Sequence, residues 1–237
     1  MSADIDFGFD PSSPSNTKIS YPNGDVYIGS VHPTKMTDES GLCLQIKHGI
    51  GKMTYKNGET FVGSFLQDLR SGLGNYKYPI GDTYHLHWSG NIPTKQGKHI
   101  GYRGRKYTGE FNENLQFHGR GILQYPTGKY YVGLWVNGKR HGIGQSEDGK
   151  GDYYIGQFQN DLYHGLGELE YGYGDKYMGE FRDGTFNGRG TFKLVIFFIL
   201  KKLDAETVAP RWGLRAGQRP ILLGSLGRWQ TAWPRHF

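Results

Sequence analysis

Residues 131–145 read YVGLWVNGKRHGIGQ, and this stretch decides the fold because its pattern returns along the chain. The motif Tyr-x-Gly-x-aromatic opens it at Tyr131–Trp135. The same motif occurs at Tyr107–Phe111, Tyr154–Phe158 and Tyr177–Phe181, so the steps between copies are 24, 23 and 23 residues. A period of this size predicts stacked structural units, each too small to bury a core alone.

A second motif, His-Gly-x-Gly, keeps the step of 23 residues and begins at His118, His141 and His164, with Asn187 in its last copy. Weaker copies extend the pattern upstream. We therefore predict a flexible N-terminus over residues 1–20, seven repeats over 21–194, and a separate segment over 195–237. In this scheme the first repeat is split by extra residues near 31–42, and the third is degenerate because Leu86 stands where a glycine belongs.

Within a repeat the apolar positions alternate with a period of two, which is typical of a strand and not of a helix. Turn dipeptides with residues that favour positive φ, at Asn57-Gly58, Asn137-Gly138 and Asp183-Gly184, separate the segments. The alternation and the turn dipeptides therefore predict one β-hairpin for each repeat. The expected fold class is all-β, an extended, twisted, single-layer antiparallel sheet of stacked β-hairpin repeats that rises about 10 Å per repeat.

The composition supports a thin sheet more than a deep core. The chain has 38 glycines in 237 residues and 15% aromatic residues, and its mean hydropathy is −0.63. A glycine inside a strand is kept where something approaches the backbone closely, and we expect that an aromatic ring lies across it. The single Cys43 fits a reducing, cytoplasmic compartment.

The positive charge is concentrated at one end of the chain. The chain carries a formal net charge of +6, but residues 201–237 hold seven Lys or Arg against two Asp or Glu. The repeats are therefore close to neutral. This distribution argues against nucleic acid as a partner of the repeats and leaves an anionic surface as a partner of the tail.

The frame Tyr-x-Gly-Glu-Trp/Phe followed by His-Gly-x-Gly resembles the MORN (membrane occupation and recognition nexus) repeat. The units that begin at Tyr107, Tyr131, Tyr154 and Tyr177 match it best, and the resemblance extends over about 170 residues. It implies an extended antiparallel sheet and, usually, a non-catalytic role in assembly. The insertion after Ser30, the unit at Tyr84 and everything after Leu194 depart from the pattern.

Several kinds of chemistry are not expected. Equivalent histidines of successive repeats should lie about 10 Å apart, too far to share one metal ion, so we predict a turn role for them and no metal. Glu110 and Glu180 recur at one position of the repeat and read as a solvated strand face, because a general acid and base need two different environments. No phosphate loop or nucleophile elbow occurs. We predict no catalytic residues and no cofactor.

One set of aromatic side chains has two interpretations, because the rings could fill the space above the strand glycines or form a surface for a partner. A thin sheet allows both. The partner-binding candidates are Tyr107, Phe111, Tyr131, Trp135, Tyr154, Phe158, Tyr177 and Phe181.

The segment after the repeats begins with the apolar run Val195–Leu200, which is shorter than the roughly 20 residues that span a bilayer. A final capping strand, a membrane-surface segment and an aggregation-prone segment are the alternatives. Beyond Ala205 the mixture of Pro, Gly, Arg and Trp indicates a disordered basic tail or a divergent terminus.

Three functions remain in view. The first is a scaffold that binds protein partners, which the resemblance places in the cytoskeleton or in a cilium or flagellum. The second is a peripheral membrane module that uses the aromatic edges and the basic tail. The third is the repeat segment of an enzyme, for which the 43 residues after Leu194 are too few to form a catalytic domain. Exposed sheet edges leave a homodimer open.

Overall fold

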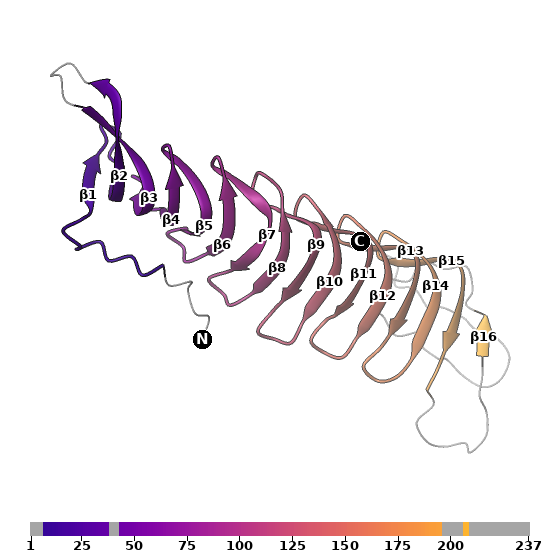
Figure 1. Cartoon of the computed structure of the whole chain (residues 1–237). Coiled ribbons are helices and arrows are strands. Elements are labelled where there is room, and N and C mark those ends of the chain that lie inside the picture. The colour runs from indigo at the N-terminus through magenta and orange to yellow at the C-terminus, as the bar shows by residue number, and fades with distance from the viewer. Residues whose placement is uncertain (1–6, 38–42, 196–205, 209–237) are drawn as a thin grey trace.

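The computed structural model describes residues 7–37, 43–195 and 206–208, and these residues form one elongated ribbon (Figure 1). The ribbon is a single open antiparallel sheet in which every strand pairs only with its neighbours in sequence. The strands run across the ribbon, so the sheet grows by one hairpin at a time. The predicted fold class is confirmed.

The sheet has sixteen strands within the described residues. They are β1 (Thr17–Ser20), β2 (Val26–Thr37), β3 (Cys43–Thr54), β4 (Thr60–Leu66), β5 (Leu69–Lys77), β6 (Thr83–Ser89), β7 (Ile92–Ile100), β8 (Lys106–Phe111), β9 (Phe117–Gln124), β10 (Tyr130–Val136), β11 (Lys139–Glu147), β12 (Tyr153–Gln159), β13 (Leu162–Glu170), β14 (Lys176–Arg182), β15 (Thr185–Lys193) and β16 (Glu206–Val208).

Two kinds of turn join the strands, one on each long edge of the ribbon. Asn137 and Gly138 have φ of 49° and 80°, the double positive φ of a two-residue hairpin turn, and Asp183-Gly184 is of the same kind. The prediction of this turn at Asn57-Gly58 is wrong. Only Gly58 has a positive φ there. Its N–H donates to the Tyr55 carbonyl over 2.9 Å in a longer loop on the opposite edge.

Asp and Asn side chains in these turns tie each repeat to its neighbour. Asp161 Oδ1 accepts the backbone N–H of Arg140 over 3.0 Å, 21 residues earlier. On the other edge Asp152 Oδ1 accepts the N–H of Gly172 over 2.9 Å. The same bridge is made by Asp25, Asp68, Asp82, Asn91 and Asp175. Each long edge is therefore held by hydrogen bonds between repeats as well as by the strand ladder.

The two faces of the sheet differ in what they carry. On β10, Tyr131 and Trp135 are buried while Val132, Leu134 and Val136 point to the other side. The same alternation on the other strands gathers most of the buried aromatic side chains on one side, which we call the aromatic face. Exposed aliphatic side chains lie on the other side, the aliphatic face.

A row of glycines runs across the middle of the aromatic face. Gly133 pairs with Gly121 on one side and with Gly144 on the other, and the pairing continues through almost every strand. Next to it the register shifts by a bulge between Gly133 and Leu134. Gly142 and Ile143 lie between the paired positions of β11, and Gly142 of the His-Gly motif has a φ of +60° there. The glycines of the sequence motif thus serve two needs, close approach in the row and positive φ at the bulge.

The degenerate third repeat replaces a ring by an aliphatic side chain. Leu86 occupies the glycine row on β6, opposite Gly97. It is 1% exposed and its side chain lies directly above Gly97, where a tyrosine ring lies in other repeats. Tyr84 is correspondingly only half-buried and packs on the His99 ring with 4.5 Å between centroids. The repeat keeps its frame because leucine fills the space that the ring gives up.

The Leu86→Ala variant should therefore be destabilised by about 2–3 kcal/mol, because it opens a cavity above Gly97. Leu73→Ala is the control, since Leu73 is 49% exposed on the aliphatic face and should change the free energy of unfolding by less than about 0.5 kcal/mol. Urea denaturation followed by circular dichroism measures both. Equal effects of the two substitutions would contradict this account of the third repeat.

The ends of the ribbon differ from a plain repeat. Thr17–Ser20, within the segment expected to be flexible, form β1 and pair with β2. The extra residues of the first repeat lengthen β2 to Thr37 and begin β3 at Cys43. At the other end Glu206–Val208 pair with β15 as β16. The apolar run beyond Val195 and the tail over 209–237 lie outside the described residues.

Candidate functional site

The eight partner-binding candidates form the buried layer of the aromatic face. Their exposed fractions run from 0% for Tyr107 and Tyr154 to 4% for Phe111. A Cβ atom built on Gly144 would lie 2.6 Å from the Cε2 and Oη atoms of Tyr131. The tyrosines thus lie directly over the glycine row, as the sequence predicts. Whether the set also binds a partner stays a prediction.

Hydrogen bonds fix the tyrosine rings in this position. The Tyr131 hydroxyl donates to the Leu134 carbonyl over 2.8 Å, three residues along the same strand. The Tyr107 and Tyr154 hydroxyls make the equivalent bond over 2.8 Å, and that of Tyr177 does so over 3.1 Å. Each bond satisfies a hydroxyl that burial would otherwise leave without a partner.

Ring contacts connect one repeat to the next. Tyr131 meets Phe158 edge to face with 4.9 Å between ring centroids, and Tyr154 meets Phe181 in the same way at 5.2 Å. Such pairs add about 0.5–1.5 kcal/mol each to the burial of the rings. The aromatic layer is therefore continuous along the ribbon, and each repeat stabilises its neighbour.

A second row of side chains covers this layer, and sequence reasoning missed it. The Phe117 ring stacks on Tyr107 and the Tyr163 ring on Tyr154, both with 3.8 Å between centroids, and both covering residues are only half-buried. They occupy the position immediately before His-Gly, where Arg140 stands in the repeat between them. We call this set the cover row: Lys47, Arg70, Pro93, Phe117, Arg140, Tyr163 and Phe186.

Arg140 takes the place of a ring in the cover row. Its guanidinium lies 5.1 Å from the Phe158 ring centroid and 5.7 Å from that of Tyr131, and its Nε is 3.1 Å from Asp161 Oδ1. Arg70 repeats the arrangement over Trp88 at 4.2 Å. These contacts are cation–π interactions. They put a positive charge and a flat polar edge on an otherwise aromatic surface.

Burial shifts the tyrosine pKa values upward. Desolvation raises the pKa of Tyr131 from its ordinary value of 10.0 to about 12, against the opposing effect of the Arg140 charge. Burial likewise raises the pKa of Tyr107 and of Tyr154. The buried phenols therefore stay protonated to a higher pH than a phenol in water.

The His32 and His48 rings lie 5.8 Å apart between centroids, while the later copies of the His-Gly motif carry their histidines in separate repeats along the ribbon. Among the described residues no group of three His, Cys, Asp or Glu side chains lies close enough to hold a metal ion. His85 bonds to the Asn75 side chain over 2.6 Å, and the buried His99 lies 3.1 Å from Asp82. Each contact gives a buried imidazole a polar partner on a neighbouring strand or turn, so the fold explains both of them.

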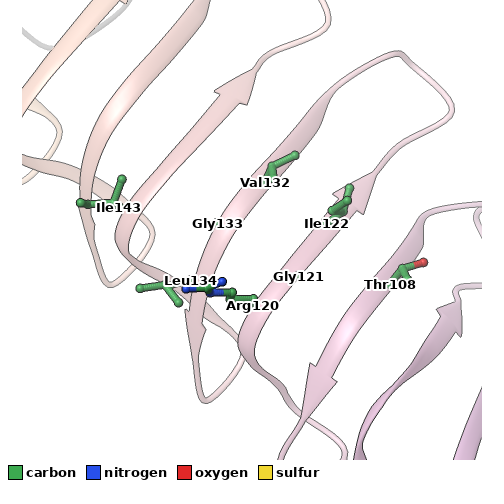
Figure 2. A pocket seen from close by; sticks show the side chains of 8 residues that line it. All are labelled: Thr108, Arg120, Gly121, Ile122, Val132, Gly133, Leu134 and Ile143. Atoms are coloured by element: carbon green, nitrogen blue, oxygen red, sulfur yellow. The ribbon is translucent and has the colours of Figure 1, made fainter.

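The aliphatic face is hollowed by a shallow pocket over β8 to β11. Figure 2 shows Ile122, Val132, Leu134 and Ile143 on the same side of neighbouring strands. Thr108, Arg120 and the backbone of Gly121 and Gly133 complete the lining. Ile143 is 70% exposed, the highest value among the large apolar side chains of the described residues. Further along the face, Ile155, Leu166 and Met178 are also exposed.

A comparison with known proteins finds a relative that matches part of this chain. Rat (Rattus norvegicus) Alsin is 30% identical over 104 residues, which cover 39% of this chain and 6% of Alsin. The chain thus spans a small fraction of that relative's length. None of the described residues forms a helix long and apolar enough to cross a membrane.

Solved structures give weaker likenesses. The SAS-4 (dCPAP) TCP domain of Drosophila melanogaster, in complex with a proline-rich motif of Ana2 (dSTIL), is 13% identical with a TM-score of 0.40 and covers 84% of this chain and 92% of its own. The TCP10 domain of Danio rerio CPAP is 15% identical with a TM-score of 0.25 and covers 70% and 84% of the two chains.

The family model of the MORN repeat matches six segments of the ribbon. They are residues 46–60, 61–83, 107–130, 131–153, 154–176 and 177–195, together more than half of the chain. The segment between 83 and 107, which the model passes over, is the repeat in which Leu86 replaces the glycine. With the aromatic layer, the glycine row and the hairpin periodicity in place, the chain belongs to the MORN repeat family.

Proposed function

We propose that this protein is a non-catalytic scaffold that binds protein partners along its aromatic face and organises cytoskeletal, ciliary or flagellar assemblies. MORN repeats are modules for interaction with proteins or membranes. The observation that carries the proposal is the cover row, in which the partly exposed Phe117, Arg140 and Tyr163 follow one another at the repeat spacing. The scaffold comprises the seven repeats over 21–194, to which Glu206–Val208 add the strand β16.

The chemistry of the cover row favours a protein partner. Aromatic residues and arginine are enriched at the centres of protein interfaces, because they offer large contact areas together with a polar group. The eight candidates beneath them, from Tyr107 to Phe181, act by holding the cover residues rigid. A partner would meet a new contact about every 10 Å along the ribbon, which suits an elongated chain.

A peripheral membrane role is the second candidate. The seven basic residues of 201–237 favour it, since each basic residue near an anionic bilayer contributes about 1 kcal/mol. The aromatic face itself adds little to this attraction, because Asp161 neutralises Arg140 and Asp68 neutralises Lys47 over 2.9 Å. Arg70, the third cation of the cover row, bonds to the neutral Asn91 side chain.

Quantitative affinity purification of the tagged full-length chain from its own cells tests the proposal. The variant Arg140→Ala/Tyr163→Ala is compared with Ile155→Ala/Met178→Ala, which truncates two exposed side chains of the aliphatic face. We expect the first variant to lose bound proteins by about tenfold, a loss of about 1.4 kcal/mol, and the control to keep them. Circular dichroism must show that both variants are folded.

Sedimentation with vesicles of phosphatidylserine and phosphatidylcholine separates the two candidates. The scaffold proposal predicts little binding of the full-length chain at physiological salt. Strong binding that falls with salt, combined with unchanged protein partners in the Arg140→Ala/Tyr163→Ala variant, would replace the scaffold by the membrane role. Diffuse distribution of the tagged protein in ciliated cells would count against the ciliary assignment.

A further inference from the structure

The aliphatic face is apolar over only one part of the ribbon. From β9 to β14 its two central rows carry seven aliphatic side chains, Ile122, Val132, Leu134, Ile143, Ile155, Leu166 and Met178. Arg120, Gln145, Gln157, Glu168 and Glu180 alternate with them in the same rows. The equivalent positions nearer the N-terminus include Lys52, Asn75 and Lys98, as the strand register shows. The patch is thus a property of this half of the chain and not of the hairpin repeat in general.

The border of this patch is acidic. Glu147 and Glu170 lie in the row of side chains beside the patch, and both pair with Tyr153, which stands on the strand between them. Glu168 lies within the patch, opposite Met178. Lys176 is the cation close to them, with its Nζ 2.7 Å from Glu170 and 3.8 Å from Glu168. Glu168 and Glu170 therefore share one lysine, and Glu147 on β11 lies three strands away from it. Arg120 is the basic residue at the β9 end of the patch, so the end around β11 to β14 would accept a segment that is both apolar and basic.

The chain itself contains such a segment. Residues 209–237 have five arginines and no Asp or Glu, together with Trp212, Trp229, Trp233 and the apolar stretch Ile221–Leu223. They follow directly on β16, which pairs with β15 at the end of the sheet that holds the patch. The distance from β16 back to β9 across the sheet is seven strand spacings, roughly 34 Å. Residues 209–237 span about 95–105 Å when fully extended, so they reach the whole patch.

We propose that residues 209–237 fold back onto the aliphatic face of the same chain between β9 and β14. Their Trp, Leu and Ile side chains cover Ile122, Ile143 and Leu166, and their arginines pair with Glu147, Glu168 and Glu170. Tethering favours this occupant over a separate molecule, because a short connection gives an effective concentration in the millimolar range. The contact covers the face opposite the cover row and is independent of the scaffold proposal.

Limited digestion of the full-length protein by trypsin tests the proposal. Mass spectrometry follows cleavage after Arg211, Arg215 and Arg228, because a docked tail is cut only when it dissociates. The test variant Ile143→Lys/Leu166→Lys changes the central residue of two Gly-x-Gly motifs in the patch. The matched control Ile50→Lys/Leu73→Lys changes the same position of two earlier repeats, where both side chains are also exposed.

We expect tail cleavage to be about fivefold faster in the test variant than in the wild type, and unchanged in the control. Charge reversal in Glu147→Lys/Glu170→Lys should accelerate it as well, which provides a second test should the first variant fold poorly. Equal cleavage rates in the wild type and both patch variants would overturn the proposal. Protection that grows with protein concentration would also overturn it, since the face would then be covered by a second copy.

Discussion

Raising the pH from 9 to 12 is expected to unfold the ribbon in a cooperative transition with its midpoint above pH 10. Buried tyrosines cause this effect. Burial raises the pKa of Tyr131 and of Tyr84 to about 12, and it raises the pKa of Tyr27, Tyr107 and Tyr154 as well. Absorbance at 295 nm reports the ionised phenols, and far-ultraviolet circular dichroism reports the sheet.

The sign follows from which state holds the proton more tightly. A phenol of the unfolded chain ionises near pH 10, whereas the folded chain keeps its phenols protonated up to higher pH. The stability that neutral phenols provide is therefore complete below pH 10 and is lost as the pH rises through the folded pKa values. A shift of two pKa units corresponds to roughly 2–3 kcal/mol for one ring, and several rings ionise in the same range.

The matched variant is Tyr131→Phe/Tyr154→Phe. Phenylalanine fits this position, because Phe61 occupies it in the second repeat and its ring covers Gly74 in the same way. Removal of two ionisable phenols should move the alkaline midpoint upward, although the hydroxyl bond to the Leu134 carbonyl is lost. An unchanged midpoint would show that groups other than the tyrosine layer control the transition.

Substitution in the glycine row should have the second large effect. Gly144→Val is expected to lower the free energy of unfolding by about 4 kcal/mol or more, because the new Cβ would lie 2.6 Å from the Tyr131 ring and the ring cannot move without leaving the layer. The backbone at Gly144 has no positive φ, so the penalty comes from lack of space. Urea denaturation provides the measurement.

A double-mutant cycle with Tyr131→Ala isolates this contact. Once the ring is removed, the valine side chain has room, so the combined variant should lose much less stability than the two single variants together. Strict additivity would contradict the proposed clash. The third repeat supports the reasoning, since there an aliphatic side chain in the glycine row coexists with a tyrosine that has turned away.

The repeat frame explains why so much of the fold could be predicted. A motif that returns every 23 residues reveals the hairpin, the strand alternation and the association of rings with glycines, because each copy repeats the same physical requirement. The Asn57-Gly58 turn shows the limit. The same dipeptide that closes a two-residue hairpin at Asn137-Gly138 sits within a longer loop at Asn57, and the difference depends on where the flanking strands begin.

The candidate site could be predicted only in part for a different reason. The eight partner-binding candidates are aromatic in each of the four repeats that they come from, so they can be recognised from the sequence. The structure places them under other side chains. The cover row changes from Phe117 to Arg140 to Tyr163, three residue types that share only a flat surface. A search for identical residues overlooks it. Its position immediately before His-Gly is the signal that would have found it.

The direction of the strands has a mechanical consequence for an elongated protein. Because the strands run across the ribbon, the hydrogen bonds between them lie along its length. A pull on the two ends would load these bonds one strand at a time, so the chain would lengthen in steps at modest force and not resist as a whole. The Asp and Asn bridges on both long edges would then set where each step begins.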